Sequence, residues 1–194
     1  MGLGDRIHVL RTFADAGLVK PLRPDKLVKI GLTLRRFGPT PAAGYAAAAL
    51  RYPNDLSVVD EPGTLTFAEV QDRTNRLANA LADRGVNEGD GVAIMVRNHR
   101  GFVEATVALS KLGANALYLN TSFAGPALAE VVQREDVDAV IYDEEFTETV
   151  DRALADKPDA TRIIAWTDGP QDGLTVEKLI TEHAGREPQR ASIK

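Results

Sequence analysis

The chain has 194 residues, of which 44% are hydrophobic and 26% charged, and its net charge is −5. This composition is typical of a globular protein with a sizeable core in one or two domains. There is no cysteine, which excludes disulfides, thiolate metal sites and a cysteine nucleophile. The three histidines, His8, His99 and His183, are far apart and lack ligand spacing, which argues against a zinc site.

Residues 1–51 form a basic segment, with nine Lys or Arg against three Asp, whereas the remainder has fourteen basic and twenty-five acidic residues. The spacing of apolar residues predicts a helix over 5–18, a second from Pro24 to about Phe37, and an alanine-rich third to Arg51. In the second helix the expected apolar stripe is Leu27, Ile30, Leu34 and Phe37, with Lys26, Lys29 and Arg36 opposite.

This basic front end has three interpretations. Its apolar stripe packs on the rest of the protein, or residues 1–40 make peripheral contact with an anionic membrane, or the stripe meets a partner protein. Nucleic-acid binding is not expected, because the acidic body would repel phosphates. The longest apolar run, "AAGYAAAAL", is too short to span a bilayer. We expect a cytoplasmic protein, with membrane-peripheral attachment left open.

Residues 52–183 follow an α/β pattern. "LSVVDEPGTLTF" predicts two short strands around a Pro-Gly turn, and Thr66 with Glu69 predicts a capping box. Apolar runs then predict strands near 92–96, 115–119, 138–142 and 162–166, with helices over 100–112, 125–134 and 144–155 between them. The fold class is therefore α/β: a mostly parallel βα-repeat sheet with helices on both faces, preceded by a helical N-terminal segment. Residues 184–194 are a tail or linker.

A sheet of this kind predicts a ligand at the carboxyl ends of its strands. The loops there contain neither GxGxxG nor GxxxxGK[ST], and the chain has no GxSxG nucleophile elbow. His99 as a general base would need an orienting carboxylate and a nearby nucleophile, and the sequence identifies neither. Asn98 is instead expected to start the following helix as a cap or half-turn. Asp143–Glu145 either binds magnesium or complements a helix dipole, and Trp166 either packs or offers a stacking platform.

The loop "NTSFAGP", residues 120–126, has hydroxyl and glycine residues before a helix. Free backbone N–H groups there could bind an anion, or the loop is a plain helix start.

Taken together, the segment "TLTFAEVQDRTNRLANALADRGVNEGDGVAIMVRNHRGFVEATVALSKLGANALYLNTSFAGPALAEVVQREDVDAVIYDEEF" resembles the N-terminal part of the AMP-forming acyl-CoA synthetases, within the adenylate-forming superfamily. The matching motifs are the Thr66–Val70 helix start, Arg76–Leu81, Gly85–Asp90 before a strand, the helix from Asn98 to Lys111-Leu112-Gly113, and Leu119–Asn120. "RNHRGF" and the basic front end look most like the bacterial fatty-acid–CoA ligases.

The resemblance implies a parent reaction in which fatty acid, ATP and CoA give acyl-CoA, AMP and pyrophosphate, with ATP, Mg and CoA as its cofactors. The family's phosphate loop, its later catalytic segments and its C-terminal domain have no counterpart in these 194 residues, so we expect a fragment that is inactive alone and binds none of these cofactors tightly. No catalytic or metal-binding residue is assigned. Thr121, Ser122 and Phe123 align with a loop that faces CoA in relatives, although relatives have glycines there.

The alternatives are a stand-alone, non-catalytic α/β binding domain, or another adenylate-forming ligase with a different acyl acid or a carrier-protein acceptor. In the whole enzyme we expect this subdomain to pack on sequence that is absent here, which leaves an apolar face uncovered. That exposed face predicts a homo-oligomer or marginal stability.

Overall fold

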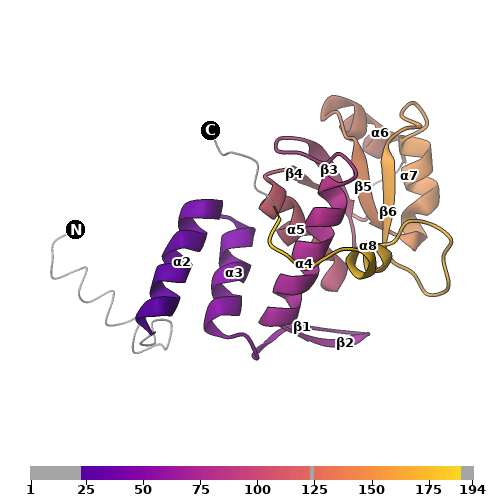
Figure 1. Cartoon of the computed structure of the whole chain (residues 1–194). Helices are drawn as coiled ribbons and strands as arrows, with labels where there is room; N and C mark the ends of the chain where they lie inside the picture. Colours follow the sequence, from indigo (N-terminus) through magenta and orange to yellow (C-terminus); the bar gives the residue numbers. More distant parts are fainter. Residues whose placement is uncertain (1–22, 123–124, 189–194) are drawn as a thin grey trace, which may run out of the picture.

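The computed structural model describes residues 23–122 and 125–188. The helix predicted over residues 5–18, Phe123, and the end of the predicted tail lie outside the described residues. Two helices come first, α2 (Pro24–Phe37) and α3 (Pro41–Arg51), and they lie against each other at one side of the molecule (Figure 1). Thr40 caps α3 with its side chain, and Pro41 follows at the first helical position.

A small hairpin leads into the main body. Its strands, β1 (Leu56–Asp60) and β2 (Gly63–Thr66), pair antiparallel around a tight turn in which Gly63 has a φ of 123°. Helix α4 (Phe67–Ala82) starts directly after β2. The backbone N–H of Glu69 donates to Thr66 Oγ1 over 3.3 Å, and the N–H of Thr66 donates to the Glu69 carboxylate over 2.7 Å. The predicted capping box is therefore confirmed.

The main sheet has four parallel strands in the order β4-β3-β5-β6, and the predicted parallel α/β fold is confirmed. The strands are β3 (Gly91–Met95), β4 (Asn115–Tyr118), β5 (Ala139–Asp143) and β6 (Thr161–Trp166). The intervening and following helices are α5 (Arg100–Leu112), α6 (Gly125–Arg134), α7 (Thr147–Ala153) and α8 (Val176–Glu182). Gly113 ends α5 in the left-handed conformation, with a φ of 75°.

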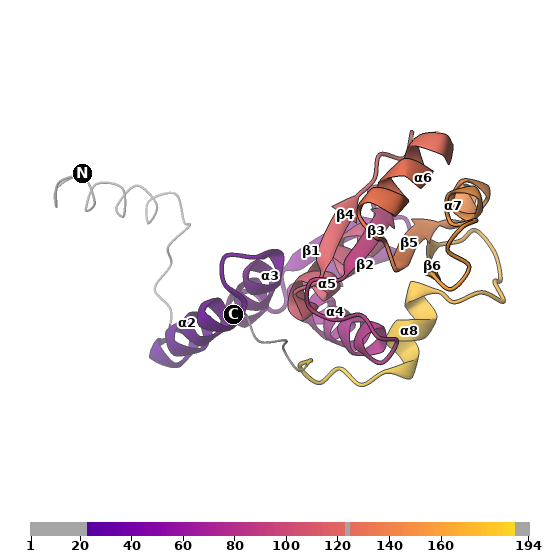
Figure 2. The same cartoon turned by 90° about the horizontal axis from the view of Figure 1, so that it is seen from above.

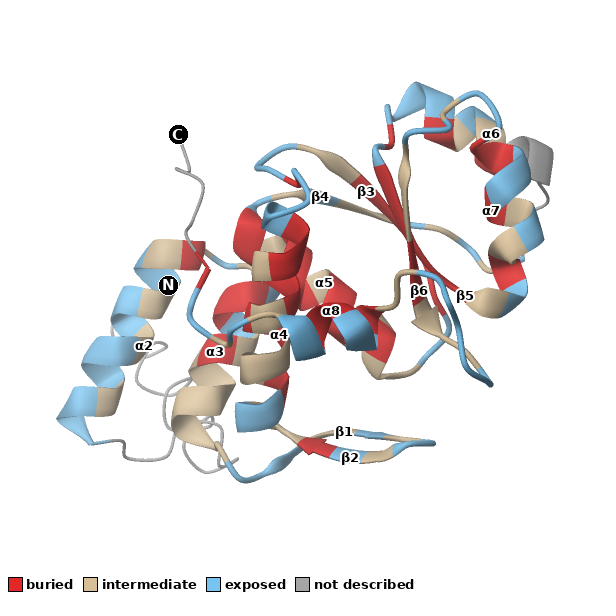
Figure 3. Cartoon of the chain, turned by 45° about the vertical axis from the view of Figure 1, so that its right-hand side comes forward, coloured by how far each residue is buried: buried red, intermediate tan, exposed pale blue. Residues whose placement is uncertain are grey.

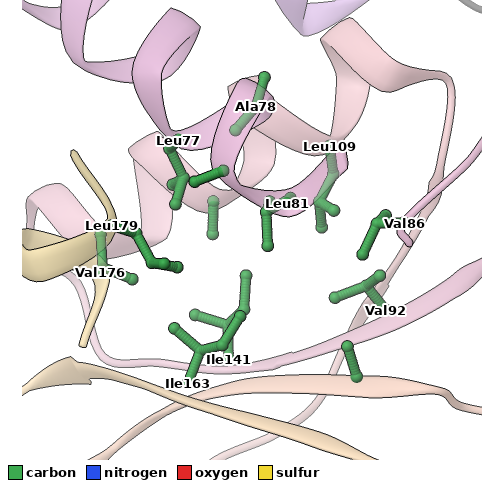
Figure 4. Packing of buried hydrophobic residues seen from close by; sticks show 14 of the residues in the cluster. Leu77, Ala78, Leu81, Val86, Val92, Leu109, Ile141, Ile163, Val176 and Leu179 are labelled. Carbon is green, nitrogen blue, oxygen red and sulfur yellow. The ribbon is translucent and has the colours of Figure 1, made fainter. Parts of the chain in front are cut away.

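Alternate side chains of the strands enter two separate cores. One face, with Ile94, Ile141 and Ile163, packs on α4, α5 and α8 through Leu77, Leu81, Leu109 and Leu179 (Figure 4). The other face, with Met95 and Tyr142, packs on α6 and α7. Figure 2 shows these two groups of helices on opposite faces of the sheet. Because both faces are covered, β3 and β5 are buried along almost their whole length (Figure 3).

Two local expectations need correction. The helix predicted over 144–155 begins instead as a 3₁₀ turn, η1 (Glu144–Phe146), and becomes α-helical only over α7. The apolar stripe of α2 is only half covered. Phe37 is buried, but Leu27 and Leu34 are 55% and 50% exposed. The main neighbour of α2 is α3, and one helix covers a narrower arc than this stripe spans.

After α8 the chain turns back along α4. The side-chain amides of Asn75 and Asn79 donate to the carbonyls of Gly185 and Ala184 over 3.1 and 3.0 Å, and Arg76 donates to the carbonyl of His183 over 2.9 Å. The first part of the predicted tail therefore lies on the folded body.

Candidate functional site

The carboxyl ends of β3 and β5 form the topological switch point of the sheet. The chain leaves β3 towards β4 on one side and leaves β5 towards β6 on the other. In sheets of this kind ligands bind where the strand order reverses. A pocket of about 570 Å³ lies there, lined by the loops that follow β3, β5 and β6 and by the turn between β1 and β2. Its lining includes Arg97, His99, Asp143, Glu145 and Trp166.

His99 connects the two central loops of this pocket. Its Nε2 lies 2.9 Å from Asp143 Oδ1, and its Nδ1 accepts the N–H of Gly101 over 3.1 Å. Since Nδ1 accepts, the ring proton of the neutral imidazole is on Nε2 and is donated to Asp143. Asp143 is the orienting carboxylate that the sequence did not identify. Helix α5 begins at Arg100, as predicted, but its cap is His99, so the expectation that Asn98 caps the helix is wrong.

The three acids after β5 have separate partners. Asp143, 2% exposed, also accepts the backbone N–H of Arg97 over 2.8 Å. Glu144 accepts the hydroxyl of Thr167 over 2.6 Å, and Glu145 forms an ion pair with Arg97. Within residues 23–122 and 125–188 no three metal-ligating side chains converge, so these acids do not fit the magnesium site considered above. Their engagement in hydrogen bonds explains them better than a helix dipole alone.

Arg97 lies between this pocket and a second hollow. Hydrogen bonds and charge from Glu145 raise the pKa of Arg97, and its guanidinium lies 5.6 Å from the centre of the Phe146 ring. Trp166 packs on the imidazole of His99 with their ring centres 5.1 Å apart, and its indole N–H donates to Asp168 over 3.1 Å. The packing interpretation of Trp166 agrees with these contacts.

The second hollow, of about 580 Å³, lies at the end of β4 and contains Thr121. The structure brings Thr121 beside Arg97, Asn98 and Phe102 from the β3 side. The N–H of Ser122, which is exposed, donates to Asn120 Oδ1 over 2.9 Å, so Asn120 holds the loop in a local turn. Phe123 lies outside the described residues, so only two of the three predicted site residues are placed.

Sequence reasoning missed an aromatic pair in which Phe102 lines this hollow and Tyr118 lies beside it. The rings of Phe102 and Tyr118 lie 5.4 Å apart, and Tyr118 is 54% exposed. The available signal was the position of Phe102 in the first turn of the helix after β3. Among the described residues that line this hollow, Arg97 is the cation, and Glu145 already pairs with it. The hollow therefore fits a polar or aromatic portion of a cofactor better than a free phosphate.

The described geometry defines a doubly wound α/β domain whose candidate site lies at the carboxyl edge of its sheet. The family model of the AMP-binding enzymes matches residues 45–191. The chain belongs to this AMP-binding enzyme family, and its resemblance to the acyl-CoA synthetases is confirmed.

Relatives agree with this assignment, and solved structures agree with the fold. A medium/long-chain-fatty-acid–CoA/3-oxocholest-4-en-26-oate–CoA ligase from Mycobacterium marinum is 28% identical over 117 residues, which are 60% of this chain and 21% of that protein. The fold matches a fatty acyl CoA synthetase from Mycobacterium tuberculosis with a TM-score of 0.66 and 24% identity, over 80% of this chain and 30% of that one. The anthranilate CoA ligase AuaEII gives a TM-score of 0.71 and 18% identity, over 79% and 29%.

The chain spans about a fifth of the length of the curated relatives it matches. Among the described residues, no helix combines the length and the apolar character needed to cross a membrane.

Proposed function

We propose that this chain is the N-terminal subdomain of an AMP-forming acid–thiol ligase that acts on fatty acids. In the parent reaction the fatty-acid carboxylate attacks ATP, releasing pyrophosphate and forming an acyl-adenylate, and the CoA thiol then displaces AMP to give the thioester. The family match over residues 45–191 carries this proposal, and the names of the relatives support the fatty-acid class. We further propose that the parent enzyme prefers long-chain acids and uses CoA as the acceptor.

In that reaction this chain would form one wall of the active site. The two hollows meet at Arg97, but the described residues that line them form neither a convergent metal site nor a phosphate-binding glycine loop. ATP and Mg would be held by the rest of the parent protein. Within this chain we propose that Thr121, Ser122 and Phe123 face CoA, with the Phe102–Tyr118 pair as the adjacent apolar surface.

Amide chemical shifts of the isotope-labelled chain, titrated with CoA, test this role. We expect shifts at Thr121, Ser122 and Phe102, and a weaker response in Thr121→Val. The matched control is Thr64→Val, at an exposed position on β2. Shifts confined to other parts of the chain, or an unchanged response in Thr121→Val, would remove the CoA-facing role while leaving the family assignment intact.

Peripheral membrane contact is a second proposal, and the surface of α2 favours it. Leu27, Val28, Leu32 and Leu34 are 50–63% exposed on a helix that also carries Lys29 and Arg35 at exposed positions. Apolar and basic side chains on one helix surface are typical of interfacial binding. Flotation with anionic liposomes should weaken in the double variant Leu27→Ser, Leu32→Ser and stay unchanged in Leu56→Ser, an equally exposed residue of β1. Equal flotation of the parent chain and both variants would exclude membrane contact through α2.

The cytoplasmic location stays a prediction.

Self-association is the remaining proposal about partners. Strand β4 is paired on one side only among the described strands, and exposed Tyr118 lies at its end. Light scattering at increasing concentration should show a growing mass, whereas a constant monomer mass would contradict self-association.

The domain limits after residues 51 and 183 also stay proposals.

A further inference from the structure

An apolar groove of about 520 Å³ lies between α2, α3 and α4, outside the site at the carboxyl edge of the sheet. Its floor is made of small side chains, because Ala46 and Ala49 come from α3 and Ala68 from α4. Leu32 of α2 forms part of the wall and is 59% exposed, so this wall is largely open to solvent. Alanines on the floor allow the side chains of another element to pack close to the backbones of α3 and α4.

Residues 1–22 directly precede α2 and lie outside the described residues. The spacing of apolar residues predicts a helix over 5–18, which has the same 14 residues as α2 and therefore the same length of about 21 Å. The connection between the two helices, residues 19–23, fits an antiparallel helical hairpin, whose loop takes about 2–5 residues. The segment is therefore long enough to return along the whole of α2.

The side chains of this predicted helix match the groove. Its apolar face consists of Ile7, Leu10, Ala14 and Leu18. Asp15 lies at the edge of that face, because it follows Ala14 directly and adjacent positions of a helix are about 100° apart. An antiparallel return sets Leu18 level with Pro24. Asp15 then lies within one turn of Lys29, which lines the groove on α2, so that opposite charges meet along the rim.

The far end of the groove lies at the last turn of α2. Arg36 belongs to this turn and lines the groove together with Glu187, and the two side chains form an ion pair. The Glu187 side chain remains 50% exposed. A helix antiparallel to α2 brings its own first turn, with Asp5 and Arg6, to this pair. Each charge of one pair then has an opposite charge within reach in the other.

We propose that residues 5–18 fold back as a helix into this groove, antiparallel to α2, with the apolar face on the alanine floor and Asp15 beside Lys29. The short connection gives this segment a high effective concentration at the groove, which a second copy or a separate partner lacks. Docking needs neither ATP nor the carboxyl-edge site, so it stands apart from the proposed ligase activity. Leu32 is common to this docking and to the membrane contact proposed above.

Paramagnetic relaxation enhancement of backbone amides in the full chain tests the proposal. Because the chain has no cysteine, Gly4→Cys carries a single nitroxide label just before the predicted helix. Docking should give the strongest enhancement at Arg36 and Glu187, at the far end of the groove. An undocked segment would instead affect the residues nearest Pro24 most. In a mixture of spin-labelled chain and ¹⁵N-labelled chain without the nitroxide, no enhancement should appear at the groove.

A charge exchange tests the register of the helix. In the spin-labelled chain, Asp15→Lys should lower the enhancement at Arg36 by about two- to fivefold, because an attraction near the surface becomes a repulsion. Addition of Lys29→Glu should restore the enhancement. The matched control adds Arg35→Glu instead, at an exposed position of α2 outside the groove lining, and should restore nothing.

Recovery in one double variant and not in the other separates docking from general damage, since a damaged fold does not recover with a second substitution. Lys29 and Arg35 are both exposed, so their replacement should leave thermal melts unchanged. Strongest enhancement near Pro24, enhancement at the groove in the mixed sample, or equal behaviour of the two double variants would overturn the proposal.

Discussion

His99 donates from Nε2 to Asp143 Oδ1 over 2.9 Å and thereby ties the end of β3 to the end of β5. The same ring caps α5 through Nδ1, which accepts the N–H of Gly101. Two adjacent strands and a helix start thus share one side chain. Long-range ¹H–¹⁵N spectra should show the Nε2–H tautomer of His99.

Replacement of Asp143, the hydrogen-bond partner of His99, tests how much this hydrogen bond contributes to stability. Asp143→Ala leaves the imidazole N–H and the backbone N–H of Arg97 without their acceptor, so the free energy of unfolding should fall by about 2–3 kcal/mol. Urea denaturation measures the change. Glu148→Ala, whose side chain is 83% exposed, should change it by less than about 0.5 kcal/mol. Equal effects of the two substitutions would contradict the structural role of Asp143.

Gly101 gives a test of the crowding beside His99. A Cβ at this position would lie 2.8 Å from His99 Cε1 and 3.1 Å from Ala165 Cβ. Gly101→Ala should therefore destabilise the chain by roughly 1–3 kcal/mol, even though alanine favours helices. In Gly31→Ala of α2 a Cβ meets nothing within 4 Å, and the stability should rise by about 0.5–1 kcal/mol. Thermal melts of both variants should shift in opposite directions, and shifts of the same sign would contradict the packing around His99.

Arg73 and Glu104 form a buried ion pair between α4 and α5. The Glu104 side chain is 1% exposed, and burial raises the pKa of its carboxyl while Arg73 opposes that rise. Arg73→Met strands the buried carboxylate and should cost about 3–5 kcal/mol of unfolding free energy. The double variant Arg73→Met, Glu104→Met should recover most of this loss, because two apolar side chains then replace the pair. A chemical-denaturation cycle in which the two single effects simply add would show that the pair is not coupled.

Lys111 predicts an unusual pH dependence. Burial lowers the pKa of its ammonium group to about 7, whereas in the unfolded chain the pKa is near 10.4. Between these values the unfolded chain binds one more proton than the folded chain, so this group makes stability rise with pH from about 7 to about 10. The free energy of unfolding should rise by at most about 1.4 kcal/mol per pH unit from this group.

The comparison protein for this pH dependence is Lys111→Met, because it keeps the other titrating groups. The unfolding free energy of the parent chain minus that of Lys111→Met should increase as the pH rises from 7 to 9.5. A difference that stays constant over this range would show that Lys111 remains fully charged in the folded chain.

Local signals in the sequence predicted much of the fold. Thr66 with Glu69 marked the start of α4, the helix predicted over 100–112 coincides with α5, and apolar runs located all four parallel strands. These features depend on residues close together in the chain. The outcome at Asn98 shows the limit, because the sequence pointed to Asn98 as the cap, whereas the backbone conformation makes the neighbouring His99 the cap.

The site was less accessible to sequence reasoning. His99 and Asp143 are 44 residues apart and meet because β5 pairs with β3 in a register that no local pattern specifies. Arg36 and Glu187 are 151 residues apart, and their contact depends on how the segment after α8 returns over α4. The exposure of Leu27 and Leu34 depended likewise on which neighbours cover α2.

ATP–pyrophosphate exchange tests the central claim most directly. That claim is that the 194-residue chain forms one wall of an acyl-CoA ligase site and cannot adenylate a fatty acid alone. The purified chain, incubated with ATP, Mg, labelled pyrophosphate and dodecanoate or hexadecanoate, should incorporate no label into ATP above the rate without enzyme. Fatty-acid-dependent incorporation would contradict the claim, because it would place a complete adenylation site within these residues.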